Sequence, residues 1–269
     1  MYRLGKTGPS ADVEMSTETT VFFLLKQECI NRTLDALLAV DIDQLIVRKA
    51  EQIHTPSISL GDIVSKRWNV DRNQILDVPY PFLPSRGLLE TPIIDRESQV
   101  ITFIGRLELR KGILELIPAL KRVLGQMPAA MMVFVGASQE SHIAGKSMKE
   151  YVMEQLSEFK DRLVFKQVQN NQIPEVLAEA DVCVFPSIWE NFPNVCLEAM
   201  SAGRAIVASI HGGMRDMLES PKAGLLVDPE NSEALSEAIC RFLSDPKLRV
   251  QLGTEARKKL LSALLRFGH

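Results

Sequence analysis

The chain contains 269 residues, of which 46% are hydrophobic and 24% charged, with 31 basic side chains against 34 acidic ones. This composition is typical of a globular protein and excludes intrinsic disorder and collagen-like repeats. The formal net charge of −3 provides no basic footprint for nucleic acid, so we expect no nucleic-acid partner. At this length a full core can form without disulfides or a structural metal.

The cysteines and the lack of long apolar runs indicate the compartment. No apolar run approaches the roughly 20 residues that span a bilayer, and the first residues lack the order of charged and apolar residues found in a signal peptide. Four widely spaced cysteines form no CxxC pair. We therefore predict a cytoplasmic protein whose cysteines are reduced core residues, namely Cys29, Cys183, Cys196 and Cys240.

The first third of the chain differs from the rest in composition and in the periodicity of its apolar residues. Residues 1–20 are polar and without periodicity, which predicts a mobile leader. Residues 21–84 have mostly helical periodicity, interrupted by a strand-like segment at 52–54, and a second helix is expected from near Ser59 to near Trp68. Three prolines and a glycine within residues 78–87 predict an interdomain linker.

Short apolar runs then alternate with amphipathic stretches. The predicted strands cover residues 100–104, 130–135, 163–168, 181–185, 205–208 and 224–227. Helical spacing of apolar residues follows from Ile113 to Leu124 and from Ala234 to Leu243. This alternation predicts an α/β fold, a doubly wound parallel sheet over residues 85–245, followed by a C-terminal helix over 246–269. Ligands of such sheets bind beyond the carboxyl ends of the strands.

The loop after the first of these strands reads Gly-Arg-Leu-Glu-Leu-Arg-Lys-Gly over residues 105–112. Gly105 permits a tight turn, and Arg106 and Lys111 place two cations at the start of a helix, where backbone N–H groups already favour an anion. A diphosphate cradle is one interpretation of this loop. A solvated loop that happens to carry basic residues is the other.

A second loop follows the strand at 181–185 and contains two glutamates with seven residues between them, Glu190 and Glu198. Pro193 near the first helical turn places Glu190 in the loop and Glu198 in the second turn of the next helix. We expect both carboxylates to face one cavity and to accept hydrogen bonds from hydroxyl groups. Paired carboxylates also occur in glycoside hydrolases, but a helix N-terminus opposes the protonation that a general acid needs. Two unrelated surface glutamates remain the plain alternative.

Both loops, in this order, resemble the donor-binding domain of the retaining nucleotide-sugar glycosyltransferases that have the GT-B fold and an E-x7-E motif. The similarity extends over roughly residues 98–260 and includes the segments FIGR at 103–106, ADVCVFPS at 180–187, EAMSAG at 198–203, Gly212-Gly213 and GLLVDP at 224–229. It implies a sugar transfer from a nucleotide-diphosphate donor, such as a UDP-, GDP- or ADP-sugar, to a sugar, lipid or small-molecule acceptor. It also implies metal-independent chemistry without a cofactor.

The resemblance assigns roles to particular residues. Arg106 and Lys111 would hold the diphosphate, Glu198 the ribose hydroxyls and Glu190 a hydroxyl of the transferred sugar, so that Glu190, Arg106 and Lys111 form the catalytic set. The remaining donor-binding positions are Gly105, Gln167, Val168, Asn191, Phe192, Asn194 and Val195, of which Gln167 and Val168 would lie beside the base. Pro193, Ala205 and Asp216 stand where the family commonly has glycine, proline and glutamate.

Only about 80 residues precede the linker, and they resemble the last helices and strand of the acceptor-side domain of such an enzyme. A donor-binding module without catalysis is therefore a second hypothesis. A nicotinamide-dependent oxidoreductase is poorly supported, because no G-x-G-x-x-G follows a predicted strand.

Four further observations concern histidines and lysines. We expect His54 to be buried packing and His142 to lie on a surface loop, while His211 belongs either to the rim of the site or to a structural turn. The predicted C-terminal helix carries a weakly basic edge that either is solvated or contacts a membrane surface peripherally; it consists of Lys258, Lys259 and Arg266.

Overall fold

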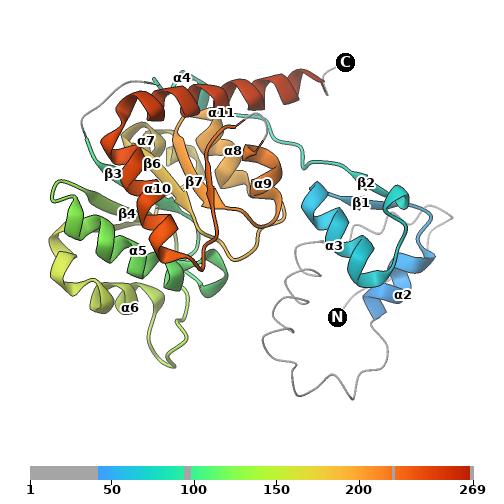
Figure 1. The fold of residues 1–269 in the computed structure, drawn as a ribbon, viewed down its shortest axis with the longest axis horizontal. Helices are drawn as coiled ribbons and strands as arrows, with labels where there is room; N and C mark the ends of the chain where they lie inside the picture. Colours follow the sequence, from blue (N-terminus) through green and yellow to red (C-terminus); the bar gives the residue numbers. More distant parts are fainter. Residues whose placement is uncertain (1–41, 94–97, 220–221, 267–269) are drawn as a thin grey trace. The chain divides into compact units, whose positions relative to one another are not determined.

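The structure is a computed structural model that describes residues 42–93, 98–219 and 222–266. The chain divides into two compact units (Figure 1). The smaller unit extends to Thr55 and includes Gly61–Asp77, and the larger unit comprises Pro56–Leu60 and the chain from Val78 onward. Cys29, the predicted leader at 1–20 and the predicted helical segment up to residue 41 are outside the described residues.

The smaller unit contains a two-stranded parallel sheet. Its elements are α2 (Ile42–Lys49), β1 (Ile53–Thr55), most of α3 (Ile58–Trp68), the 3-10 turn η1 (Arg72–Gln74) and β2 (Ile75–Asp77). Thr55 lies opposite Asp77 in the sheet register. The predicted short strand and the helix that ends at Trp68 are confirmed to within one residue.

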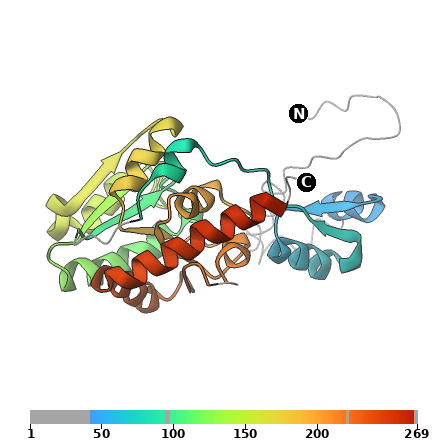
Figure 2. The same cartoon turned by 90° about the horizontal axis from the view of Figure 1, so that it is seen from above.

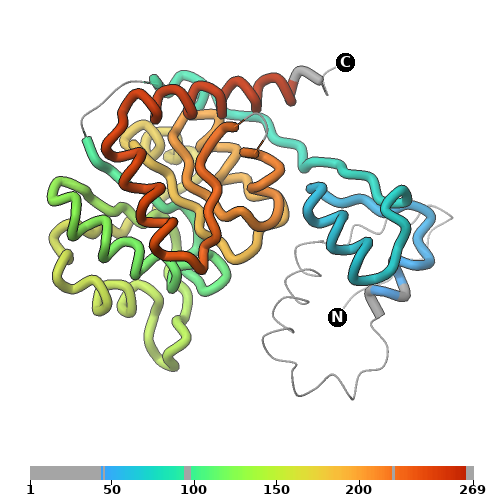
Figure 3. Tube along the Cα trace, in the orientation of Figure 1, coloured from blue at the N-terminus to red at the C-terminus, as the bar shows by residue number. Residues whose placement is uncertain are grey.

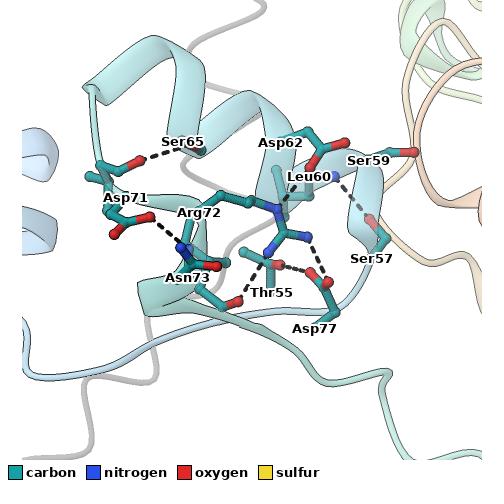
Figure 4. Close-up of polar contacts among 12 residues, drawn as sticks. Thr55, Ser57, Ser59, Leu60, Asp62, Ser65, Asp71, Arg72, Asn73 and Asp77 are labelled. Carbon is teal, nitrogen blue, oxygen red and sulfur yellow. Dashed lines mark hydrogen bonds and ion pairs between the residues drawn. The ribbon is translucent and has the colours of Figure 1, made fainter.

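Arg72 ties the helix of this unit to its sheet (Figure 4). Its Nε donates to Asp62 Oδ1 at 2.8 Å, and its Nη2 donates to Asp77 Oδ2 at 2.6 Å. Thr55 Oγ1 donates to the other oxygen of the Asp77 carboxylate at 3.1 Å. The hydrogen bonds from Arg72 to Asp62 and Asp77 raise the pKa of its guanidinium above the ordinary value. This network links α3 to the carboxyl ends of both strands.

From Val78 onward the larger unit has an extended segment at 78–85 (Figure 3), followed by alternating helices and strands. The helices are α4 (Arg86–Glu90), α5 (Ile113–Gln126), α6 (Met148–Gln155), α7 (Ile173–Glu179), α8 (Asn194–Ser201), α9 (Gly213–Leu218), α10 (Ser232–Ser244) and α11 (Pro246–Arg266). The strands are β3 (Val100–Ile104), β4 (Met131–Val135), β5 (Leu163–Lys166), β6 (Val182–Phe185), β7 (Ala205–Ser209) and β8 (Leu225–Val227). Short 3-10 turns are η2 (Leu109–Lys111), η3 (Ser157–Arg162) and η4 (Asn170–Gln172).

The six strands form one parallel sheet in the order β5-β4-β3-β6-β7-β8. Numbered from β3, this is the order 3-2-1-4-5-6 of a doubly wound dinucleotide-binding sheet. The chain reverses direction across the sheet between β3 and β6, and ligands of such sheets bind in the crevice beyond the strand ends at this point. The predicted α/β fold class is therefore confirmed.

Both faces of the sheet are covered, which explains why its strands are continuously apolar. Along β6, Val182 and Val184 pack into a core formed with α5, α6 and α10, whereas Cys183 and Phe185 pack into a second core formed with α4, α7, α8, α9 and α11. Figure 1 shows these two helical layers on either side of the strands. The sheet thus holds the β3 and β6 ends between two rigid layers.

The long helix α11 lies along one side of the larger unit (Figure 2) and packs against α8 and β7. Its Ala256 and Leu260 are buried in the second core. Among the residues that the structure describes, no helix combines the length and the apolar character needed to cross a bilayer.

Candidate functional site

Three loops meet at the carboxyl edge of the sheet, and they follow β3, β6 and β7. The N–H of Ile188 in the β6 loop donates to the carbonyl of Arg110 in the β3 loop at 3.0 Å. On the other side, the N–H of Gly213, after β7, donates to the carbonyl of Glu190 at 2.8 Å. The loop that carries Glu190 is therefore held by main-chain bonds from both neighbours.

Glycines allow these loops to approach so closely. Gly112 and Gly212 have φ angles of 71° and 69°, in the left-handed region that glycine adopts without strain. A Cβ at Gly112 would lie 1.8 Å from the Pro186 carbonyl oxygen, and one at Gly213 would lie 1.8 Å from that of Asn191. The glycines at 112, 212 and 213 are thus required by packing between loops.

Glu190 is buried, with 3% of its surface exposed, and two cations contact the same carboxylate oxygen. Lys111 Nζ donates a hydrogen bond to Oε1, and Arg110 Nη1 lies 3.0 Å from it. The lysine and arginine side chains are only 15% and 21% exposed. The structure therefore brings together Lys111 and Glu190, which the sequence places 79 positions apart, and excludes the interpretation of Glu190 as a surface residue.

Arg106, the other predicted cation, has a different environment. Its side chain is 58% exposed, and its Nη2 lies 3.3 Å from Glu108 Oε1. Arg110 shares that carboxylate at 3.2 Å. Gly105, where the loop leaves β3, is held by a bond from its N–H to the Val135 carbonyl at 2.9 Å. The solvent-facing guanidinium of Arg106 can therefore turn to an anion at the cost of one exposed ion pair.

Glu198 lies in the second turn of α8, as predicted, and is half-buried. Burial raises the pKa of its carboxyl above the ordinary value. No hydrogen bond to this carboxylate is found within the described ranges, and the backbone N–H groups of Asn194 and Val195, in the first turn, also find no acceptor there. Free N–H groups at a helix start are a binding site for an anion.

The remaining predicted positions surround these groups. Asn191 is buried and accepts a hydrogen bond from Trp189 Nε1 at 2.8 Å. Phe192 is half-buried, with its ring edge-on to Tyr80 at 6.4 Å between centroids. Beyond β5, Gln167 is exposed and Val168 is half-buried against the second core.

Sequence reasoning missed Arg110 and Trp189 as parts of this site. Arg110 was visible as a third cation in the loop at 105–112, but spacing alone does not show which cation reaches Glu190. Trp189 directly precedes Glu190, and its role depends on a turn that returns the indole to Asn191.

Some predictions outside the site were wrong. His54 is exposed, and its Nε2 lies 2.9 Å from Gln52 Oε1, because β1 belongs to a two-stranded sheet that leaves this side chain in solvent. Cys183 and Cys196 are buried free thiols, as predicted, but Cys240 is only half-buried at the surface of α10. His142 is exposed, with its ring against Tyr151, as expected of a surface loop.

The predicted basic edge of α11 is also corrected in part. Lys259 is half-buried and donates to the Asp216 carbonyl at 3.4 Å, and burial lowers the pKa of its ammonium group. Lys258 is exposed and lies 3.8 Å from Glu255. The side chain of Arg266 is outside the described part of the chain. His211, at the rim of the β7 loop, lies 3.7 Å from Asp228.

The doubly wound parallel sheet, with the loops after β3, β6 and β7 meeting at its carboxyl edge, places the chain in the class of α/β proteins whose ligands bind at that edge. Within that class, the family described as glycosyl transferases group 1 matches residues 90–259. The chain belongs to this family. In the described residues, no three His, Cys, Asp or Glu side chains gather in a way that could hold a metal ion.

Known proteins with similar sequences and structures agree with this family. The chain is 26% identical to glycogen synthase from Mycobacterium tuberculosis over 232 residues, which are 82% of this chain and 52% of that protein. Its structure is similar to sucrose-phosphate synthase from Thermosynechococcus elongatus, with a TM-score of 0.66, 27% identity, and coverage of 82% of this chain and 56% of that one.

HepE from Anabaena, solved in complex with UDP-glucose, is similar with a TM-score of 0.63 and 19% identity, over 82% of this chain and 62% of that one. This third similarity concerns the fold. The chain spans about half the length of the curated relatives that it matches.

Proposed function

We propose that this chain binds a nucleotide-diphosphate sugar at the carboxyl edge of the six-stranded sheet and serves glycosyl transfer from that donor. The observation that carries the proposal is the contact between Lys111 and buried Glu190, in the loop that leads into α8, whose first N–H groups find no acceptor among the described residues. A cation and an anion-binding helix end suit a diphosphate, and a neighbouring carboxylate suits sugar hydroxyls.

Each residue has a role in this proposal. Arg106, Lys111 and the first turn of α8 hold the diphosphate, and Glu198 accepts from the ribose hydroxyls. Glu190 accepts from a hydroxyl of the transferred sugar. Gln167 and Val168 lie beside the base, because β5 ends next to β4 at the same edge.

The proposed reaction breaks the bond between the anomeric carbon and the diphosphate oxygen, and the nucleoside diphosphate leaves with the electron pair. The acceptor oxygen forms the new bond to that carbon and releases its proton to the solvent, so the products are the glycoside, the nucleoside diphosphate and one proton. Stabilising the departing diphosphate lowers the barrier, and Arg106, Lys111 and the helix N-terminus supply positive charge without requiring a metal ion. We include retention of configuration, which the E-x7-E spacing of Glu190 and Glu198 supports by resemblance.

We propose that the transferred sugar is a hexose, because two similar proteins, glycogen synthase and sucrose-phosphate synthase, are named for products that are built from hexoses. UDP is the first nucleotide to test, because HepE was solved with UDP-glucose. The acceptor is a sugar, a lipid or a small molecule. We propose a cytoplasmic location, and exposed Lys258 is the described part of α11 that supports a peripheral contact with the inner membrane face.

The test is calorimetry and thermal shift with UDP-glucose, GDP-mannose and ADP-glucose. A ligand at 100-fold excess over its Kd stabilises the folded state by about 2.7 kcal/mol. Lys111→Ala should weaken nucleotide binding by roughly 10–100-fold, through loss of a charge-assisted bond, and Arg106→Ala by a smaller factor because Arg106 is exposed. Arg122→Gln removes an exposed cation from α5 and is the matched control. Wild-type affinity in both loop variants would overturn the proposal.

A second candidate function is donor binding without catalysis, since the residues assigned above hold the donor and none of them is assigned to the acceptor. Donor hydrolysis and transfer assays with the chain alone separate the two. Turnover supports the enzyme, whereas nucleotide-sugar binding without turnover supports the module.

A further inference from the structure

Arg110 is a cation of the site to which the proposed function assigns no role. Its guanidinium lies between two carboxylates, 3.2 Å from Glu108 Oε1 and 3.0 Å from Glu190 Oε1. Because the group is planar and has five donors, it can serve both acids at once. Its side chain is 21% exposed, so water shields these contacts only in part.

Lys111 and Arg110 share one carboxylate oxygen of Glu190, and this creates a conflict when a ligand binds. In the proposed complex Lys111 turns to the diphosphate. Glu190 is 3% exposed and would then lack its nearest cation, and a buried carboxylate without a partner is strongly destabilising. Binding would carry that penalty unless a second cation stays with Glu190.

We propose that Arg110 is a positioning residue that remains as the counter-ion of Glu190 when Lys111 turns to the diphosphate. Glu108 aligns the guanidinium for this role by accepting from its other end. Arg110 itself does not contact the donor. The inference rests on the proposed function, since it requires a diphosphate that competes for Lys111.

Other charged groups around Glu190 do not replace Arg110. Arg106, in the same loop, lies near Glu108 and is mostly exposed. From the β7 loop, Gly212 and Gly213 present main chain to Glu190, and the adjacent His211 lies near Asp228. Among these described neighbours, Arg110 is the cation positioned to keep Glu190 paired.

A double-mutant cycle in the full chain tests this role, with calorimetry of UDP, GDP and ADP as probes. Arg110→Gln should weaken nucleoside diphosphate binding by about tenfold or more, because Lys111 can leave Glu190 only by exposing an unpaired charge. Arg110→Lys keeps a cation and should bind within about threefold of wild type. In the double variant Arg110→Gln/Glu190→Gln no buried charge needs a partner. Its affinity for the nucleoside diphosphate should therefore equal that of Glu190→Gln alone.

The outcomes are distinct. If the double variant binds as weakly as Arg110→Gln, Arg110 contacts the ligand directly and the inference is overturned, while the proposed function stands. If wild-type protein binds none of the three nucleotides, the proposed function fails and the inference fails with it. Unfolding midpoints of every variant, with Arg122→Gln as the control, separate a lost fold from lost binding. If Arg110→Gln does not fold, the affinities of Arg110→Lys and of the double variant still decide whether Arg110 acts as the counter-ion of Glu190.

Discussion

The two glutamates of the site have opposite electrostatic environments. Glu190 is buried and forms ion pairs with Lys111 and Arg110. Glu198 is half-buried and has no hydrogen-bond partner for its carboxylate in the described part of the chain, and burial raises its pKa. A charge that is desolvated but unpaired weakens the free protein and is available to a ligand.

Replacing Glu198 with Gln should therefore affect stability and binding in opposite directions. The pKa of Glu198 in the folded protein lies above its unfolded value of about 4.5. Protonated Glu198 therefore favours the folded state fully below pH 4.5, and this contribution to stability is lost as the pH rises through the folded-state pKa. At pH 7 Glu198→Gln should be more stable than wild type by about 1 kcal/mol, because the carboxylate is only partly desolvated, and the two proteins should be equally stable near pH 4. Urea unfolding at both pH values measures this.

In the same variant, affinity for the nucleotide-sugar should fall by roughly tenfold, because an amide replaces a charged acceptor. Glu237→Gln, at an exposed position of α10, is the matched control and should change neither property. Equal stability of Glu198→Gln and wild type at pH 7 would contradict the assignment of an unpaired, desolvated carboxylate.

At the level of elements, the sequence predicts the sheet better than the site. The apolar runs at 100–104 and 205–208 become β3 and β7 to within one residue, because both faces of each strand are covered. Gly212-Gly213 could be recognised as a motif in the sequence, but only the structure shows why glycine is needed there, namely close contact with the Glu190 loop. Such contacts join segments far apart in the chain, and no local pattern records them.

Arg204 illustrates the same limit. In the sequence it is only the middle residue of a Gly-x-Pro segment whose proline is replaced by Ala205. In the structure it is buried and donates to the carbonyls of Ala202 at 2.9 Å and Ala180 at 3.3 Å. A buried guanidinium that satisfies main-chain carbonyls needs a particular tertiary arrangement, so its role could not be predicted from local sequence.

The glycine contacts between loops lead to a prediction at this level. Gly213→Ala places a Cβ 1.8 Å from the Asn191 carbonyl oxygen, which should destabilise the protein by about 2–3 kcal/mol and weaken nucleotide binding, because the Glu190 loop must shift. Gly125→Ala, in α5, meets no atom within 4 Å and should stabilise by about 0.5–1 kcal/mol. Thermal unfolding and calorimetry of both variants check this. If the two variants behaved alike, close packing of the loops would not be what holds the site.

At the scale of the whole molecule, the two apolar cores and the proposed donor site share one unit. The buried members of both cores lie between Leu88 and Leu260, and the predicted donor-binding residues lie between Gly105 and Glu198. Phe82, in the segment at 78–85, packs against the second core. The smaller unit has its own network around Arg72 and contributes none of these residues.

The fragment from Val78 to His269 omits Pro56–Leu60 of the larger unit but keeps every buried member of both cores, so it should fold and bind nucleotides by itself. We expect cooperative unfolding, because a continuous core remains, and a nucleoside diphosphate Kd within about threefold of that of the full chain. Circular dichroism melts and calorimetry measure both quantities, and the same fragment with Lys111→Ala should lose binding if the site is the one proposed. A fragment that folds but binds more than about tenfold more weakly would show that residues before Val78 contribute to the donor site. Wild-type binding by the fragment would instead assign the donor site to the larger unit alone.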